Sequence, residues 1–382
     1  MTSSLSDRSQ YPCLRDTVYL NQASLGLIGQ PAVAAMHDFL ENVARHGNLF
    51  MSDGDEIKYG QALRKVASRL FHNDPSRIAI LASASELLGQ FPLLFRLNPN
   101  TTILAVASDF PAITRPWVRQ SYGEKIRVRF VDDLPDRDLT ETITSAIDET
   151  TGVIAVSSVQ YATGTLVDVR RLARSAQKVG AFLIIDATQA AGAMRVDTST
   201  LEADAVVTSG YKWLGGHGGV ALAVVSESLL KQIPILPGWM GATEPFDFDA
   251  KSVSFASDAR RFTQSTMSYV SIAGLTVSIE QLLALGENRI EEHARQLAGM
   301  LVDGACEYGW EPFHDVHDAA ASPHIISLGH SRKSARETVE KLRDQRIMCS
   351  ARGERIRVSL APYNDASDVM KLFQVLAEFH ST

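Results

Sequence analysis

Two short apolar runs within residues 181–219 constrain the fold of this chain most. Residues 182–185 and 205–207 consist of Phe, Leu, Ile, Val and Ala and show no polar alternation. This pattern is typical of strands that are buried on both faces of a parallel sheet. Asp186 follows the first run, and Lys212 follows shortly after the second. Because open α/β sheets bind ligands beyond the carboxyl ends of their strands, both side chains are predicted to share one site.

The pairing of an acid with an amine indicates a class of cofactor. Pyridoxal phosphate (PLP) needs one covalent amine, which a lysine supplies as a Schiff base. It also needs one anionic partner, which an aspartate supplies at the pyridinium nitrogen. Asp186 and Lys212 therefore predict a PLP site.

The remainder of the large domain alternates strands with helices, which favours a parallel, doubly wound sheet. Further strands are expected over residues 77–81, 102–106, 126–131, 152–157 and 220–225, and helices over 31–45, 55–71, 87–97 and 169–178. From residue 234 to about 264 the periodicity weakens, and a long loop near the site is expected.

The C-terminal part has the pattern of a small α+β unit. One or two long helices are expected over residues 271–308, and strands and helices over 324–328, 335–346, 355–360 and 365–379. We expect an N-terminal arm and substrate loop over 1–30, with a poorly ordered lead-in over 1–18. A large domain follows over 31–265 and a small one over 266–382, with the bridging helix at about 271–304.

Composition excludes several classes of function. The 382 residues carry a formal charge of −7, with 45% hydrophobic and 21% charged residues, and no basic block that would indicate a nucleic-acid partner. The three cysteines form no CxxC motif, so neither a disulfide framework nor a metal site is expected. No signal core or membrane-length apolar run is present, and a cytoplasmic protein without a membrane partner is expected.

The motifs Asp186-Ala-Thr-Gln189 and Ser209-Gly-Tyr-Lys212 resemble those of one family. The chain is similar to the class V, fold-type I PLP enzymes, which include cysteine desulfurases, selenocysteine lyases, kynureninases, isopenicillin-N epimerase-like proteins and some aminotransferases. The resemblance covers about residues 19–379. It implies a mainly parallel seven-stranded sheet with a small α+β C-terminal domain, PLP as cofactor and an α-amino acid as substrate.

The resemblance also assigns cofactor roles to individual residues. Lys212 is implied to be the Schiff-base lysine and the catalytic acid and base, Asp186 the partner of the pyridine nitrogen, and Gln189 the partner of O3′. Phe110 is implied to stack on the ring, with a core aromatic as the alternative. Contacts to the cofactor phosphate are implied for Ala84, Ser85, Ser209 and Tyr211. Thr163 is implied to lie in a turn under the cofactor, and Thr266 to reach the phosphate in the neighbouring subunit. Ser85 and Thr266 could equally be cap or turn residues.

The contact of Thr266 implies a homodimer with shared active sites, although Ser265 replaces the glycine of the family's G-T pair. Arg357, in the motif R-x-S…Y-N, is implied to clamp the substrate α-carboxylate, which a planar guanidinium can bind bidentately. Arg352 is a second, weaker candidate for this clamp. The N-terminal loop, through Asn21 and Ala23, is implied to contact the substrate.

Sequence patterns leave the reaction branch open. Cys349 lies eight residues before Arg357 and directly after an apolar pair, so it is predicted to be a structural thiol rather than the loop nucleophile of a desulfurase. Phe110 and Tyr211 favour kynureninases, whereas Gln189 and Ile113 disfavour them. We expect a C–S β-lyase that acts on cysteine or an S-substituted cysteine without a persulfide cysteine. The alternatives are an aminotransferase, an epimerase or a kynureninase-like C–C hydrolase, and, last, a non-catalytic PLP-fold binding protein.

Overall fold

The centre of the large domain is a seven-stranded sheet with the order β2-β8-β7-β6-β5-β3-β4. The computed structural model describes residues 2–123 and 125–378. The strands are β2 (Ile78–Leu81), β3 (Thr102–Val106), β4 (Arg127–Val131), β5 (Thr151–Ser157), β6 (Phe182–Asp186), β7 (Ala205–Ser209) and β8 (Ala221–Val225). Strand β8 pairs antiparallel with both neighbours, and the other pairs are parallel. The mainly parallel sheet expected from the sequence is therefore confirmed.

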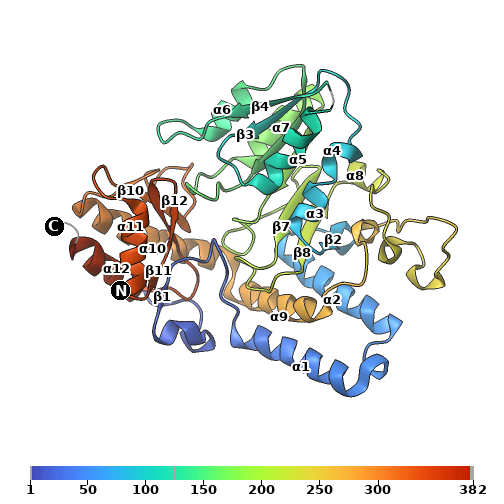
Figure 1. The fold of residues 1–382 in the computed structure, drawn as a ribbon, viewed down its shortest axis with the longest axis horizontal. Helices are drawn as coiled ribbons and strands as arrows, with labels where there is room; N and C mark the ends of the chain where they lie inside the picture. The colour runs from blue at the N-terminus through green and yellow to red at the C-terminus, as the bar shows by residue number, and fades with distance from the viewer. Residues whose placement is uncertain (1, 124, 379–382) are drawn as a thin grey trace.

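Helices cover both faces of this sheet, as the apolar runs require (Figure 1). Successive strand residues point to opposite faces, so Ile185 packs in the core on one side and Ile184 in the core on the other. The first core includes α2 (Asp53–Leu70), α6 (Leu139–Ser145), α7 (Val169–Val179) and α9 (Tyr269–Leu285). The second includes α3 (Ala84–Leu88), α4 (Phe91–Leu94) and α5 (Pro111–Ser121). Two further helices are α1 (Gln30–His46), which packs against α9, and α8 (Glu227–Leu230).

A four-stranded antiparallel sheet forms the small domain, with the order β12-β13-β10-β9. Its strands are β9 (Glu311–Pro312), β10 (Ile325–Gly329), β12 (Ser350–Arg352) and β13 (Arg355–Ser359). Its helices are α10 (Glu287–Glu307), α11 (Ala335–Asp344) and α12 (Ala366–Glu378). The N-terminal strand β1 (Val18–Tyr19) pairs in parallel with β11 (Ile347–Met348), which brings the blue segment of Figure 1 to the red domain.

Helices α9 and α10 connect the two cores. Gly286, with φ +87°, separates them, and their axes differ by 75°. Ile272 and Leu275 of α9 belong to the core of the large sheet, whereas Leu297 of α10 belongs to that of the small sheet. The expected domain boundary at residues 265 and 266 stays a prediction. Within the described residues, no single helix has the length and apolar character needed to cross a membrane, and only the bent pair of α9 and α10 taken together meets that test.

Two expectations about local structure are wrong. The lead-in over residues 1–18, where described, forms two 3-10 helices, Arg8–Gln10 and Pro12–Arg15. It is tied down because Arg8 Nη1 lies 2.7 Å from the buried Asp368 carboxylate. The single helix expected over 87–97 is broken into α3 and α4, because Gly89 ends the first and Pro92 lies in the first turn of the second. The expected long loop over 234–264 is confirmed, with short 3-10 turns inside it.

Candidate active site

Lys212 lies in a turn just beyond the carboxyl end of β7. Its side chain is buried, and Nζ forms no hydrogen bond within the described part of the chain. The ring centroids of Phe110 and Tyr211 lie 5.2 Å and 5.8 Å from Nζ. Burial, together with the nearby guanidinium groups of Arg357 and Arg352, lowers the pKa of Lys212 to about 8, although Asp186 acts in the opposite direction. Roughly a tenth of such amines are neutral, and therefore nucleophilic, at pH 7.

The turn that carries Lys212 is held by the N-terminal segment. Gln22 Nε2 donates to the Lys212 carbonyl at 2.9 Å, and Gly26 N donates to the Tyr211 carbonyl at 2.9 Å. A Cβ atom on Gly26 would lie 2.1 Å from the Lys212 carbonyl oxygen. Only glycine allows this close approach of two backbones, so the lysine turn has a fixed position.

Asp186 and Gln189 lie beside this turn, at the end of β6. Asp186 Oδ1 accepts a hydrogen bond from Thr188 N at 2.8 Å, and burial raises the pKa of Asp186. Gln189 Oε1 accepts from Trp213 Nε1 at 2.7 Å, and Gln189 Nε2 donates to the Ala23 carbonyl at 3.1 Å. The indole can only donate and the carbonyl can only accept, which fixes the orientation of the amide. One N–H of Gln189 remains for a ligand.

His324 supports Gln189 from the small domain. Its Nε2 lies 2.5 Å from the Gln189 carbonyl oxygen, and its ring packs edge-on against Trp213 at 4.6 Å. Burial lowers the pKa of His324 to about 4, so the imidazole is neutral at pH 7 and donates through Nε2.

Phe110 is placed by Asp109, a residue that the sequence analysis did not single out. The buried Asp109 carboxylate accepts from the backbone N–H groups of Phe110 and Ser157 at 2.6 and 2.7 Å, and also from the Ser157 hydroxyl and Gln160. Burial raises its pKa to about 6. Phe110 caps α5 and is 39% exposed, with Tyr161 edge-on at 5.4 Å. Its predicted stacking on the cofactor stays a prediction.

The predicted phosphate contacts lie at the start of α3 and the end of β7. Ala84 and the exposed Ser85 begin α3, and Ser209 N donates to Thr188 Oγ1 at 3.1 Å. Tyr211 is half-buried beside Lys212, and Thr266 is exposed at the end of the long loop. No described contact tests their roles toward a phosphate.

Thr163 has partners within the chain. Its hydroxyl donates to Asp133 Oδ2 at 2.6 Å, and Thr165 joins the same carboxylate to His314. The neighbouring Gly164 has φ +79°, and a Cβ atom there would lie 2.1 Å from the Ile325 carbonyl oxygen. This turn therefore connects the large domain to the small sheet, and the cofactor role of Thr163 stays a prediction.

Arg357 and Arg352 converge on one hydroxyl group. Arg357 Nη2 donates to Ser24 Oγ at 2.5 Å, and Arg352 Nη2 donates to the same atom at 3.0 Å. Arg357 also donates to the Tyr161 carbonyl at 2.8 Å and is only 1% exposed. Burial, and next the charge of Arg352, lower the pKa of Arg357 to about 9. Two unit charges roughly 5 Å apart repel by roughly 3 kcal/mol at an effective dielectric constant of about 20.

Residues 21–26 contact the lysine turn, Gln189 and both arginines. Ser24 donates to Asn21 Oδ1 at 2.8 Å, which places Asn21 beside the arginines. Ala23 is buried, with its N–H donating to Ser359 Oγ and its carbonyl accepting from Gln189. The substrate contacts predicted for Asn21 and Ala23 stay predictions. The segment nevertheless shows that the lysine, the glutamine and the arginines belong to one region.

Cys349 lies between β11 and β12 and is 5% exposed. Burial raises the pKa of its thiol to about 12, although Arg357 acts in the opposite direction. A thiol in such surroundings is not ionised at pH 7 and is a poor nucleophile. The other two cysteines, Cys13 and Cys306, are exposed. Among the described residues, no cluster of side chains could hold a metal ion.

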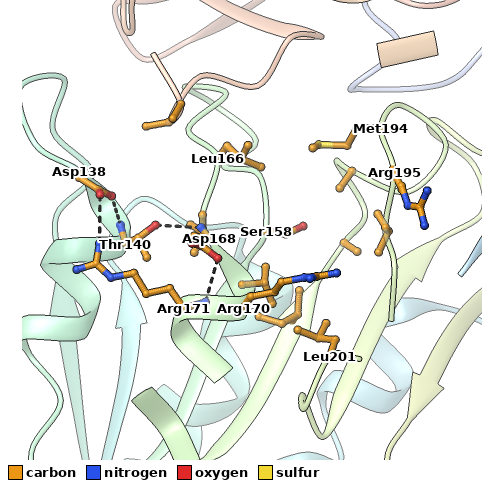
Figure 2. A pocket seen from close by; sticks show the side chains of 18 of the residues that line it. Asp138, Thr140, Ser158, Leu166, Asp168, Arg170, Arg171, Met194, Arg195 and Leu201 are labelled. Carbon is orange, nitrogen blue, oxygen red and sulfur yellow. Dashed lines mark hydrogen bonds and ion pairs between the residues drawn. The ribbon is translucent and has the colours of Figure 1, made fainter. Parts of the chain in front are cut away.

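A cavity of about 870 Å³, apart from these residues, is lined mainly by the large domain and also by residues 318–320 of the C-terminal part (Figure 2). Its apolar lining includes Ile185, Ala187 and Leu201. Many of the charged side chains around the cavity form ion pairs with one another; for example, an Asp138 carboxylate oxygen lies 3.7 Å from Arg171 Nη1. The cavity contains neither Lys212 nor Arg357, so the candidate active site lies elsewhere.

Comparison with known proteins places this geometry in context. Residues 18–372 match the family model of class-V aminotransferases. The uncharacterised aminotransferase YcbU of Bacillus subtilis is 24% identical over 371 residues, which cover 97% of this chain and 96% of YcbU. Kynureninase of Deinococcus radiodurans is 32% identical over 289 residues, which cover 72% of this chain and 67% of that enzyme.

The fold also matches solved structures. The cystine C–S lyase C-DES, in complex with its reaction product cysteine persulfide, superimposes with a TM-score of 0.89 at 20% identity. The match covers 97% of this chain and 99% of that one. At this level of identity the likeness establishes the fold.

Proposed function

Because the chain belongs to the class-V aminotransferase family, we propose that it is a PLP-dependent C–S β-lyase that acts on cysteine or an S-substituted cysteine. Members of this family are PLP-dependent enzymes, so the predicted enzyme class and cofactor are confirmed. The predicted fold-type I architecture is confirmed as well. The lyase branch is the part that we propose.

The residues at the strand ends fit PLP. The Lys212 amine has no hydrogen-bond partner within the described residues, and Gln189 has one spare N–H. The buried Asp186 carboxylate accepts hydrogen bonds from Thr188 and lies close enough to Lys212 to raise the pKa of its amine. Lys212 would hold the cofactor covalently, Asp186 its pyridine nitrogen, and Gln189 its phenolic oxygen. When bound, PLP accepts the electron pair that is released at the substrate Cα.

The protein's own groups then direct the chemistry. Arg357 binds the α-carboxylate and thereby sets which bond at Cα faces the cofactor. The Lys212 amine, with a pKa of about 8, removes the Cα proton and can return it. Asp186 keeps a proton on the pyridine nitrogen. The C–S bond breaks with its electron pair on sulfur, and one water is consumed, so that the products are a thiol, pyruvate and ammonia.

One observation supports the lyase branch most: the Cys349 thiol near Arg357 is buried, and burial raises its pKa. A desulfurase needs an ionisable cysteine to accept sulfur from the substrate, whereas Cys349 is buried with a pKa of about 12. A β-lyase releases the thiol directly and needs no cysteine nucleophile. This supports elimination over persulfide transfer.

Product analysis tests the proposal. The holoenzyme is incubated with L-cysteine, S-ethyl-L-cysteine, L-kynurenine and L-alanine. Pyruvate and thiol in equal amounts support the proposal. Absence of pyruvate from the cysteine compounds would contradict it. In that case anthranilate from kynurenine would indicate a hydrolase, a keto acid formed only when an acceptor keto acid is added would indicate an aminotransferase, and racemised alanine would indicate an epimerase.

A cysteine variant separates the lyase from a desulfurase. Cys349→Ala is expected to keep turnover within about twofold, since it removes no reacting group. Cys306→Ala is the matched control at an exposed position. Loss of about a hundredfold in Cys349→Ala alone would show persulfide chemistry instead.

Kynureninase-like hydrolysis is the second candidate. The observation that favours it is the 32% identity to a kynureninase, together with the placement of Phe110 and Tyr211 around Lys212. The product panel distinguishes it from the lyase.

Assembly and location are further proposals. The exposed Thr266 at the end of the long loop supports a homodimer in which this residue reaches the partner's site. Sedimentation measurements test the dimer, and activity of mixed dimers tests the sharing of sites. A cytoplasmic location is supported by three free cysteines among the described residues, and fractionation of cells tests it.

A further inference from the structure

The two arginines at the substrate end carry more positive charge than one α-carboxylate neutralises. Arg352 and Arg357 both donate to Ser24 Oγ, so their Nη2 atoms lie within hydrogen-bond distance of one atom. Among the described residues, no carboxylate forms an ion pair with either arginine. Both charges lower the pKa of Lys212, so their field reaches the reacting amine. Buried charges are expected to be paired, and the buried Arg357, with the second cation Arg352 beside it, therefore favours anions from a ligand.

The two guanidinium groups differ in how deeply they lie and in how firmly they are held. Arg357, on β13, is 1% exposed, donates inward to the Tyr161 carbonyl, and keeps a buried Nε without a hydrogen-bond partner. Arg352, on β12, is partly exposed, and its other hydrogen bond is to the adjacent Ala351 carbonyl. Arg357 is thus the buried member of the pair, and Arg352 is nearer to solvent.

The hydroxyl between them is a weak partner for two cations. Ser24 donates its proton to Asn21 Oδ1 and accepts from both arginines. A neutral hydroxyl contributes no charge, so it holds the guanidinium groups in place without compensating them. A bound dianion would compensate both.

We propose that Arg352 is a specificity residue that selects substrates with a second anionic group on the side chain. Arg357 takes the α-carboxylate, and Arg352 takes a carboxylate or a comparable acid group that extends toward solvent. This proposal rests on the proposed function, because it takes the reaction to be C–S bond cleavage. It narrows the substrate class to acidic S-substituted cysteines and related amino-dicarboxylates.

Binding of unreactive diacids tests the proposal without turnover. Succinate and its monoamide, succinamate, have nearly the same shape and differ by one negative charge. Calorimetry on the holoenzyme is expected to show at least about tenfold tighter binding of succinate, because the second carboxylate gains a charge-assisted pair. In Arg352→Gln the preference is expected to fall below about twofold. Arg352→Lys should retain most of it, and Arg332→Gln, at an exposed arginine of the same domain, should leave it unchanged.

Turnover of a second matched pair links this selectivity to the reaction. The kcat/KM for S-carboxymethyl-L-cysteine is expected to exceed that for S-carbamoylmethyl-L-cysteine by at least about tenfold. Arg352→Gln should remove this difference, mainly by lowering kcat/KM for the carboxymethyl compound. If neither compound releases pyruvate while the succinate preference holds, the lyase proposal fails and the selectivity stands.

Three results would overturn the selectivity. One is equal binding of succinate and succinamate to the unaltered enzyme. Another is an equal loss of affinity for both ligands in Arg352→Gln, which would mean that both arginines clamp the α-carboxylate. The third is an unchanged preference in Arg352→Gln, which would make Arg352 a surface residue without a ligand. Circular dichroism of each variant confirms that the fold is retained.

Discussion

The cofactor end and the substrate end of the site are built in different ways. The cofactor end takes Asp186 and Lys212 from the ends of the paired strands β6 and β7 of one rigid sheet. The substrate end takes Ser24 from the N-terminal segment and Arg352 and Arg357 from the small sheet. The cofactor end has an acid near its amine, whereas the substrate end has two cations and no acid among the described residues. The positive charge at the cofactor end thus has a negative partner within the chain, whereas the positive charges at the substrate end need anions from the ligand.

The strongest test of the cofactor end removes its amine. Lys212→Ala is expected to lower turnover by at least about a thousandfold, because the variant loses both the covalent attachment and the group that moves the Cα proton. The measurement is pyruvate release under saturating substrate. Lys178→Ala, at an exposed position on α7, is the control. Turnover above about a tenth of the original rate in Lys212→Ala would remove Lys212 from the mechanism.

At the substrate end, Arg357→Ala is expected to raise KM by about a hundredfold while PLP absorbance stays unchanged. The substitution leaves the substrate α-carboxylate without its charged partner, which costs about 2–5 kcal/mol. Steady-state kinetics and the absorption spectrum are measured side by side, with Arg332→Ala as control. A KM that does not change would mean that Arg357 does not bind the α-carboxylate. A simultaneous loss of PLP would mean that the two ends are not separate in function.

The pKa of Lys212 gives a smaller, pH-dependent effect. Only the neutral amine attacks the PLP aldehyde, and burial lowers the pKa to about 8 rather than the usual value above 10. The rate at which apoenzyme takes up PLP should rise by about tenfold from pH 7 to pH 9 and then level off. Stopped-flow absorbance follows this reaction. A rate that continues to rise through pH 10 would show that the amine is not perturbed.

Trp213→Phe gives the smallest effect and sharpens the picture of the cofactor end. It leaves the buried Gln189 Oε1 without its donor. The free energy of unfolding should fall by about 1–3 kcal/mol, as measured by urea denaturation of the apoenzyme. Trp239→Phe, in the long loop and 36% exposed, should change it by less than about 0.5 kcal/mol. Equal effects of the two substitutions would show that the hydrogen bond to Gln189 does not stabilise the fold.

The same contrast explains what the sequence predicts. The strand ends at Asp186 and near Lys212 follow from short apolar runs, because a strand buried on both faces has an unmistakable local pattern. The burial of Cys349 also follows from its apolar neighbours. Ser24 could not be predicted as the hydroxyl shared by two arginines, because that contact joins residues far apart in the chain. The same is true of Gln22, which supports the Lys212 carbonyl.

Other differences have local causes that compete with periodicity. The apolar pattern over 87–97 suits one helix, but Gly89 and Pro92 divide it in two. Asp109 follows a buried strand, as Asp186 does, and this signal could have identified it as a residue that positions Phe110. The lead-in is ordered because Arg8 pairs with the buried Asp368 carboxylate on α12. This partner could not be predicted from residues 1–18 alone.

Chemical labelling tests the central claim most directly. The holoenzyme is reduced with borohydride, digested, and mapped by mass spectrometry to find the lysine that carries the pyridoxyl group. We predict stoichiometric labelling of the peptide that contains Lys212 and of no other lysine peptide. Label on a different lysine, or an unlabelled Lys212 in fully PLP-loaded protein, would contradict the account.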